Sequence, residues 1–137
     1  MYGSRKGKEF DHRMHPRIKA ITVRAGSVVD GISISYPGKT FSNGGTGGKA
    51  HTMELERGEW VTDVTVRATD DGIQALTFKT NKGQTLSAGG GGGLFGRKGE
   101  EFESSAPEGG QLCGIKGRES KSLDAIALRW GPVPKNL

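Results

Sequence analysis

The chain has 137 residues, of which 32% are hydrophobic and 24 are glycine, and its formal net charge is +5. This is the size of one domain, which we expect to span residues 1–137, and no apolar run is long enough to cross a membrane. The single cysteine, Cys113, excludes an intrachain disulfide and a multi-cysteine zinc site. The polar N-terminal segment lacks the hydrophobic stretch of a signal peptide, which leaves two locations open: the cytoplasm, or secretion with the signal already removed.

The positive charge is concentrated at the N-terminal end. Residues 1–24 hold seven Lys and Arg side chains against two acidic ones, whereas the rest of the chain holds thirteen of each sign. A basic end of this kind suits a polyanionic partner, although a solvated face is the commoner role of a charge run.

Apolar and polar residues alternate with the period of a β-strand over residues 32–36, 64–67, 76–79 and 126–130. Valine, isoleucine and threonine dominate these segments, and glycine-containing turns separate them. Because no amphipathic window of helical length occurs, we predict an all-β protein of about ten to twelve short strands.

A threefold repeat is suggested by aspartates that precede strands and by glycine-bearing loops. The aspartates are Asp30, Asp71 and Asp124, and the loops occupy residues 3–7, 44–48 and 89–93. From each aspartate to the last glycine of its loop the spacing is 18, 22 and, counted through the C-terminus, 20 residues. A threefold arrangement closed by the two chain ends explains this spacing; chance repetition of short β motifs is the alternative.

Six pieces, in order along the chain, resemble the jacalin-related lectins: Phe10-Asp11, residues 21–30, residues 43–48, Gly58-Glu59, residues 76–81, and residues 114–118 with 123–126. The resemblance covers roughly residues 2–130. It implies a β-prism I fold, in which three four-stranded Greek-key sheets surround a pseudo-threefold axis. It also implies carbohydrate binding without metal, cofactor or catalysis, and a homodimer, which is common among these lectins.

An aspartate that faces a glycine loop is a physically reasonable hexose site. The carboxylate can accept hydrogen bonds from two vicinal hydroxyls, backbone N–H groups can donate to the sugar, and glycine permits a close approach. The alternative is an aspartate that caps its own turn, which is the usual role of Asp beside Gly.

The resemblance places the first carbohydrate site on Gly7, Ser120, Lys121, Ser122, Leu123 and Asp124. Gly7 would lie against the sugar, the N–H groups of Lys121 and Ser122 or Leu123 would donate, and Asp124 would supply the carboxylate. The sequence departs from the family at Ser120, where glycine is usual, and in the opening Ser4-Arg5-Lys6. Because Gly7 is internal to a continuous chain, the resemblance favours mannose- or glucose-type oligosaccharides, or glycoproteins bearing mannose, over galactose.

A second site is implied by the spacing Gly-x-x-x-Asp that some mannose-binding members carry. It comprises Gly48 opposite Gly26, Ser27, Val28, Val29 and Asp30. The third position has Asp71 but Arg67 where glycine is expected, so we interpret it as structural.

Two rival functions remain open at this level. The first is a polyanion-binding module for sulfated glycosaminoglycan or acidic lipid headgroups, formed by Lys6, Lys8, Arg118 and Lys121; residues 7–10 resemble a loop of the family's animal zymogen-granule lectin. Nucleic acid is not expected as a partner. The second is a structural or assembly domain whose sites no longer bind.

Other chemistry finds little support. Gly44 to Lys49 lacks the Ser/Thr of a phosphate-binding loop, and His12 with His15 is a poor metal site for two histidines alone. Cys113 lies among apolar residues and is expected to be buried and inert. No nucleophile is spaced with a base, so we predict no enzymatic activity.

Overall fold

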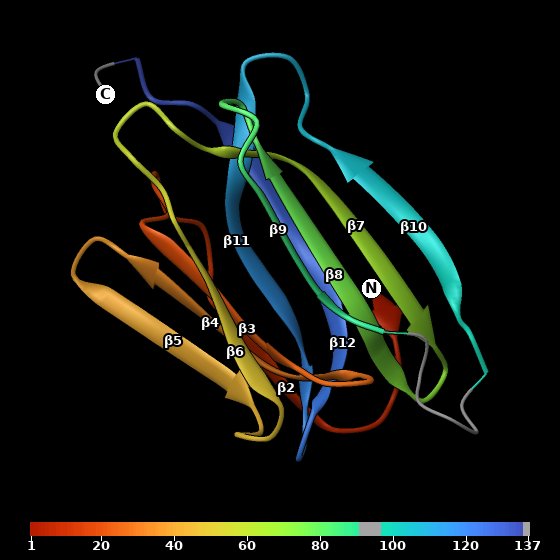
Figure 1. Ribbon diagram of the computed structural model, residues 1–137. Coiled ribbons are helices and arrows are strands. Elements are labelled where there is room, and N and C mark those ends of the chain that lie inside the picture. The colour runs from red at the N-terminus through yellow and green to blue at the C-terminus, as the bar shows by residue number, and fades with distance from the viewer. Residues whose placement is uncertain (91–96, 136–137) are drawn as a thin grey trace.

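The computed structural model describes residues 1–90 and 97–135, which form twelve β-strands and no helix (Figure 1). The strands are β1 (Tyr2–Gly3), β2 (Lys8–Asp11), β3 (Ala20–Ala25), β4 (Val29–Tyr36), β5 (Lys39–Gly44), β6 (Lys49–Glu54), β7 (Val61–Thr69), β8 (Gly72–Thr80), β9 (Thr85–Gly89), β10 (Glu100–Ser105), β11 (Gly110–Glu119) and β12 (Leu123–Pro132). No helix among these residues is long and apolar enough to cross a membrane.

The strands form three antiparallel sheets of four strands each, as predicted. Their orders are β1-β12-β11-β2, β5-β4-β3-β6 and β10-β7-β8-β9. Each sheet has a central hairpin flanked by two edge strands, and the first sheet draws its edge strands from the N-terminal end of the chain and its central hairpin from the C-terminal part. The chain ends therefore close the structure, as the circular spacing predicted.

The strand register defines which residues are equivalent in the three sheets. Gly3 pairs with Ala125, Gly44 with Gly31 and Gly89 with Ala75, so the preceding residues Asp124, Asp30 and Gln74 occupy equivalent positions. The glycines that precede the outer strands β2, β6 and β10 are likewise equivalent; they are Gly7, Gly48 and Gly99.

This register corrects the sequence-based assignment of the third repeat. Asp71 lies in the β7–β8 turn, three positions before the true equivalent, Gln74. The pair Asp71-Gly72 resembles Asp30-Gly31, but Asp-Gly also occurs in hairpin turns, and here Asp70 and Asp71 form the two-residue turn while Gly72 begins β8 opposite Thr69. Residues 91–93 of the third predicted glycine loop lie outside the described residues, and the loop that ends in Gly99 is longer than its two counterparts.

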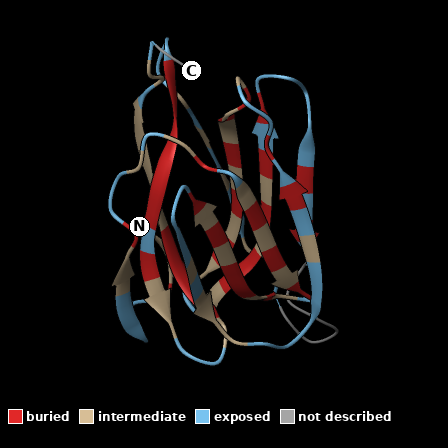
Figure 2. Cartoon of the chain, turned by 90° about the vertical axis from the view of Figure 1, so that its left-hand side faces the viewer, coloured by how far each residue is buried: buried red, intermediate tan, exposed pale blue. Residues whose placement is uncertain are grey.

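The core lies between the inner faces of the three sheets, where alternate residues of the central strands are buried (Figure 2). Val29, Ile73 and Leu123, which begin or nearly begin equivalent strands, are all buried near the pseudo-threefold axis. Cys113 is also buried, as expected. Each fully buried aliphatic side chain contributes about 1.5–3 kcal/mol, so this shared interior gives the turns above it a rigid base.

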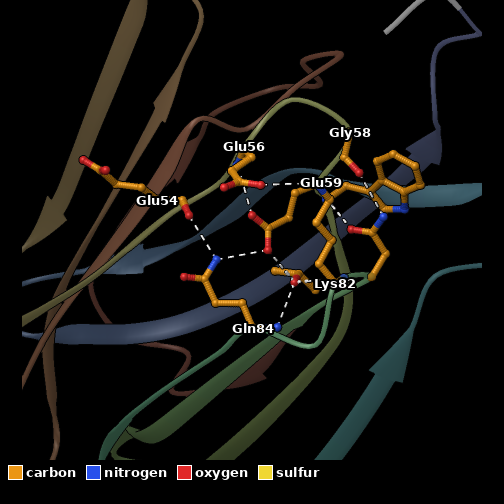
Figure 3. Close-up of polar contacts among 9 residues, drawn as sticks. Glu54, Glu56, Gly58, Glu59, Lys82 and Gln84 are labelled. Atoms are coloured by element: carbon orange, nitrogen blue, oxygen red, sulfur yellow. Dashed lines mark hydrogen bonds and ion pairs between the residues drawn. The ribbon is translucent and has the colours of Figure 1, made fainter.

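A buried carboxylate, Glu59, holds the end of the molecule opposite the glycine loops (Figure 3). It accepts hydrogen bonds from the backbone N–H of Glu56, the hydroxyl of Thr80 and the amide of Gln84, at 3.0, 2.8 and 3.0 Å. Burial alone would raise its pKa, but these hydrogen bonds outweigh burial and lower the pKa. The Gly58-Glu59 pair, which is part of the family resemblance, therefore has a structural role: Glu59 connects the β6–β7 loop to the β8–β9 turn by hydrogen bonds.

Candidate functional site

The three central hairpin turns gather at one end of the molecule, at the bottom of Figure 1, together with the glycine loops of the first two sheets. The turn of the first sheet touches Gly45 in the loop of the second sheet, and the turn of the second sheet lies against Gly90, which follows β9 of the third sheet. We call the turn-and-loop pair of each sheet its position. The turn of the first position is residues 120–122, between β11 and β12, and that of the second is residues 26–28, between β3 and β4; the two turns are built alike.

At the first position the carboxylate of Asp124 lies directly against Gly7. Gly7 has φ +91°, and a Cβ there would overlap both Asp124 Oδ2 and the carbonyl of Glu119, so glycine is required. Asp124 is 7% exposed, and its Oδ2 is the one buried side-chain polar atom with no hydrogen-bond partner among the described residues. An unpaired buried acceptor costs free energy, which a ligand hydroxyl can recover.

The turn beside Asp124 offers donors that complement this acceptor. The N–H of Ser120 donates to the carbonyl of Ser122 at 3.0 Å, which tightens the turn. The N–H groups of Lys121 and Ser122 make no hydrogen bond within the described part of the chain. One unpaired carboxylate oxygen and two unpaired N–H groups therefore belong to the same short segment, residues 121–124, and are the acceptor and donors that a sugar with adjacent hydroxyls needs.

Serine at position 120 fits this turn without strain. The equivalent Gly26 makes the same bond, from its N–H to the carbonyl of Val28 at 3.0 Å, and neither residue has a positive φ. A Cβ at Gly26 would meet no atom within 4 Å. The departure of Ser120 from the family pattern thus leaves the backbone of the first site unchanged.

The second position repeats the first with Asp30 and the loop Gly44–Gly48. Gly48 has φ +71°, and a Cβ there would overlap Asp30 Oδ2; the N–H of Gly45 donates to the carbonyl of Asp30 at 2.7 Å. Arg24 shapes the loop by donating to the carbonyls of residues 46–48 at 3.0 to 3.2 Å. The structure therefore brings together all the residues predicted for the second site, with Asp30 only half-buried.

The third position is closed by the protein itself. The amide of Gln74 replaces the carboxylate; its Oε1 accepts from the N–H of Gly99 at 2.7 Å and its Nε2 donates to the carbonyl of Arg97 at 2.6 Å. Both ends of the amide are therefore hydrogen-bonded to the backbone, and the negative charge that Asp124 and Asp30 provide at the other two positions is absent. Arg67 pairs with Glu101 at 2.8 Å, and Asp71 is an exposed turn residue, so neither builds a site.

The predicted cations divide into two groups. Lys6 and Lys8, on either side of Gly7, and Lys121 are exposed and form no ion pair among the described residues. Arg118 instead pairs with Glu9 at 2.9 Å and donates to the carbonyl of Gly7 at 3.2 Å. Arg118 therefore positions Gly7, and of the four predicted cations the three lysines are the ones without an ion pair among the described residues.

Sequence reasoning missed Glu119, Asn43 and Gly45, which join the first site to the second. Glu119 accepts hydrogen bonds from Asn43 and Gly44, and Gly45 lies against the carbonyl of Lys121. These residues come from different sheets, so no local pattern connects them.

Comparison with known proteins agrees with this architecture. Residues 1–128 match the model of the family described as the jacalin-like lectin domain. The chain is 32% identical to horcolin of barley, Hordeum vulgare, with 96% of this chain and 94% of horcolin covered. Among solved structures, wild-type Malaysian banana lectin is 28% identical with a TM-score of 0.85, and artocarpin in complex with mannotriose is 26% identical with a TM-score of 0.75. The match to banana lectin covers 96% of this chain and 94% of the lectin, and the match to artocarpin covers 95% of this chain and 93% of artocarpin.

The chain belongs to the jacalin-like lectin family. Its fold is the β-prism I of these lectins, as the family resemblance implied. Lectins bind carbohydrates without altering them, so the chain is a carbohydrate-binding protein and not an enzyme.

Proposed function

We propose that the chain binds mannose- or glucose-type oligosaccharides, without a metal ion, at two sites centred on Asp124 and Asp30. The observation that carries the proposal is the unpaired, buried Oδ2 of Asp124, which follows closely in the chain on the unpaired N–H groups of Lys121 and Ser122. Artocarpin, one of the similar structures, is seen with mannotriose bound, and the champedak lectin, 25% identical, is described as mannose-binding.

The chemistry at the first site follows from its donors and acceptors. Two adjacent hydroxyls of one hexose donate to the carboxylate of Asp124, and the turn N–H groups donate to sugar oxygens. Hydrogen bonds to a charged acceptor are roughly twice as strong as neutral ones, so the carboxylate dominates the affinity. Gly7 lets the ring approach, because any side chain there would occupy the space above the carboxylate.

Two sites on one chain suit a branched glycan, since linked binding events raise the effective affinity. A homodimer, which the resemblance implies, would add to this effect. Among the described residues the only exposed large hydrophobic side chains are Met1 and Met14, so a dimer interface would be mainly polar. Light scattering at several concentrations tests the dimer directly.

Titration calorimetry with methyl α-mannoside, with and without a metal chelator, tests the proposed function. We expect saturable binding that the chelator leaves unchanged, and weaker or no binding of methyl α-galactoside. Absence of mannoside and glucoside binding by the folded chain contradicts the proposal.

A polyanionic ligand is the second candidate function, and the three exposed lysines favour it. Lys6 and Lys121 lie on the two loops that form the first site and Lys8 begins β2 directly after Gly7; none of the three has an acidic partner within the described residues. A sulfated glycan could place its sugar ring against Asp124 and its sulfate groups near these ammonium groups.

A further inference from the structure

The carboxylate of Glu119 lies at the junction of the two proposed sugar sites. Glu119 ends β11 and directly precedes the turn of the first site. Its Oε2 accepts from the side-chain amide of Asn43 at 2.7 Å, and its Oε1 accepts from the N–H of Gly44 at 3.1 Å. Asn43 and Gly44 end β5, where the glycine loop of the second site begins. One side chain thus binds the starts of both loops.

A second contact packs the first-site turn directly against the glycine loop of the second site. Gly45 lies so close to the carbonyl of Lys121 that a Cβ at residue 45 would overlap it. The same Gly45 donates its N–H to the carbonyl of Asp30. A shift of the first-site turn therefore displaces the glycine loop of the second site.

The hydrogen bonds from Asn43 and Gly44 to Glu119, called the bridge below, are also connected to the core. Asn43 Oδ1 can only accept, so the 2.6 Å contact requires that His12 Nε2 donates to it; His12 Nδ1 then accepts from the hydroxyl of Tyr36 at 2.8 Å. His12 and Tyr36 are 1% and 2% exposed. A continuous chain of hydrogen bonds runs from the buried interior to the Glu119 carboxylate.

The three junctions of the pseudo-threefold structure are not alike. The positions equivalent to Glu119 hold Ala25 and Ala68, and those equivalent to Asn43 hold Tyr2 and Ala88. Alanine cannot form this bridge. The polar bridge therefore occurs at one junction, the one that adjoins both proposed sites, while the other two junctions adjoin the closed third position.

We propose that Glu119 is a positioning residue for both carbohydrate sites. Its carboxylate holds the first-site turn and the second-site glycine loop at a fixed separation, so that its removal weakens glycan binding at both. Binding groups must be held within about half an ångström of their productive positions, and hydrogen bonds from surrounding residues provide that precision. The inference rests on the proposed function.

The test is Glu119→Gln, measured separately at each site. This change preserves size but leaves a single acceptor oxygen for two donors, the Asn43 amide and the Gly44 N–H, so one of the two hydrogen bonds is lost whichever way the new amide is turned. The Asp30→Ala background isolates the first site and the Asp124→Ala background isolates the second. Titration with methyl α-mannoside should show affinity weaker by about threefold to tenfold in both backgrounds. Glu108→Gln, an exposed change in the β10–β11 turn, should leave both affinities unchanged.

Rescue separates positioning from a general loss of stability. Adding Asn43→Asp to Glu119→Gln reverses donor and acceptor, since the new amide donates to the new carboxylate, which still accepts from His12. We expect affinities within about twofold of the parent at both sites in this double variant. Asn43→Ser breaks the bridge from β5 and must reproduce the weakening, which gives the test a second route should Glu119→Gln not fold.

The inference is overturned if a folded Glu119→Gln variant binds with parental affinity at either site, or if the folded double variant is not rescued. A parent chain that binds no mannoside contradicts the proposed function itself. A binding parent with an unaffected Glu119→Gln variant contradicts only the role of Glu119.

Discussion

The carboxylate of Asp124 lies against the Cα of Gly7, although the two residues come from opposite ends of the chain. The contact exists because β1 pairs with β12 and β2 pairs with β11, so the N-terminal loop crosses over the β11–β12 turn. It leaves no space for a side chain at residue 7.

Gly7→Ala should therefore abolish binding at the first site and leave the second intact. The new Cβ would overlap Asp124 Oδ2, and the left-handed backbone at φ +91° costs a non-glycine residue about 1 kcal/mol. Gly38→Ala is the matched control, because Gly38 also has positive φ, +77°, but no atom lies within 4 Å of its Cβ position. The control should lose similar stability and bind two equivalents of mannoside by calorimetry; equal binding by both variants would contradict the assignment of Gly7.

The number of sites is predicted to be two per chain. Asp124 and Asp30 present carboxylates to glycine loops, whereas both ends of the Gln74 amide are bonded to the backbone at residues 97 and 99. Calorimetry with monosaccharide should give two equivalents for the parent and one for Asp30→Ala. One equivalent in the parent would reduce residues 26–30 to a structural turn.

Salt dependence should distinguish neutral from anionic ligands. Heparin-like chains should bind through the lysines beside Gly7 and lose about tenfold or more in affinity between about 50 and 200 mM salt, because counterions are released on binding. Mannoside binding should hardly respond, since exposed lysines contribute little to a neutral ligand.

The double variant Lys6→Ala/Lys8→Ala should weaken heparin binding, and Lys19→Ala/Lys116→Ala, which removes the same charge from exposed positions elsewhere, should weaken it far less. Failure of heparin to bind at low salt would eliminate the polyanion role.

Acid should destabilise the fold partly through Asp11. Hydrogen bonds from Arg129, at 3.0 and 2.5 Å, are the largest influence and lower the pKa of Asp11 to about 2, against a partial opposing effect of burial. A carboxyl with a depressed folded-state pKa stabilises the fold above its unfolded pKa, and that stabilisation is lost as the pH falls from about 4 to about 2.

Chemical denaturation should show that Asp11→Asn costs about 1–2 kcal/mol at pH 6 and much less near pH 2. Asp70→Asn, in the exposed β7–β8 turn, serves as the control, because this side chain has no hydrogen bond or ion pair among the described residues and its replacement should cost little stability. A cost for Asp11→Asn that stays constant with pH would show that the ion pair does not contribute in this way.

Local patterns carried much of the prediction. Alternating Val, Ile and Thr side chains predicted the strands, because each sheet has one buried and one solvated face. The pairing of Asp124 with Gly7 came from the family resemblance and from the circular spacing, and the structure brings those two residues together.

The errors and omissions have physical causes. Asp71 was taken as the third repeat's aspartate because Asp-Gly occurs both at strand starts and in hairpin turns, and only strand register separates the two. Glu119 and Asn43 were missed because their contact joins two sheets, and nothing near either residue in the sequence indicates the other.

Calorimetry of Asp124→Ala with methyl α-mannoside tests the central claim most directly, with Asp71→Ala, in the exposed β7–β8 turn, as the control aspartate. Loss of charge-assisted hydrogen bonds, each about 1.5–3 kcal/mol, should weaken the first site by more than about tenfold and leave one equivalent bound at the second. The melting temperature should stay close to that of the parent, and Asp71→Ala should bind as the parent does. A folded Asp124→Ala variant that still binds two equivalents with parental affinity would contradict the account.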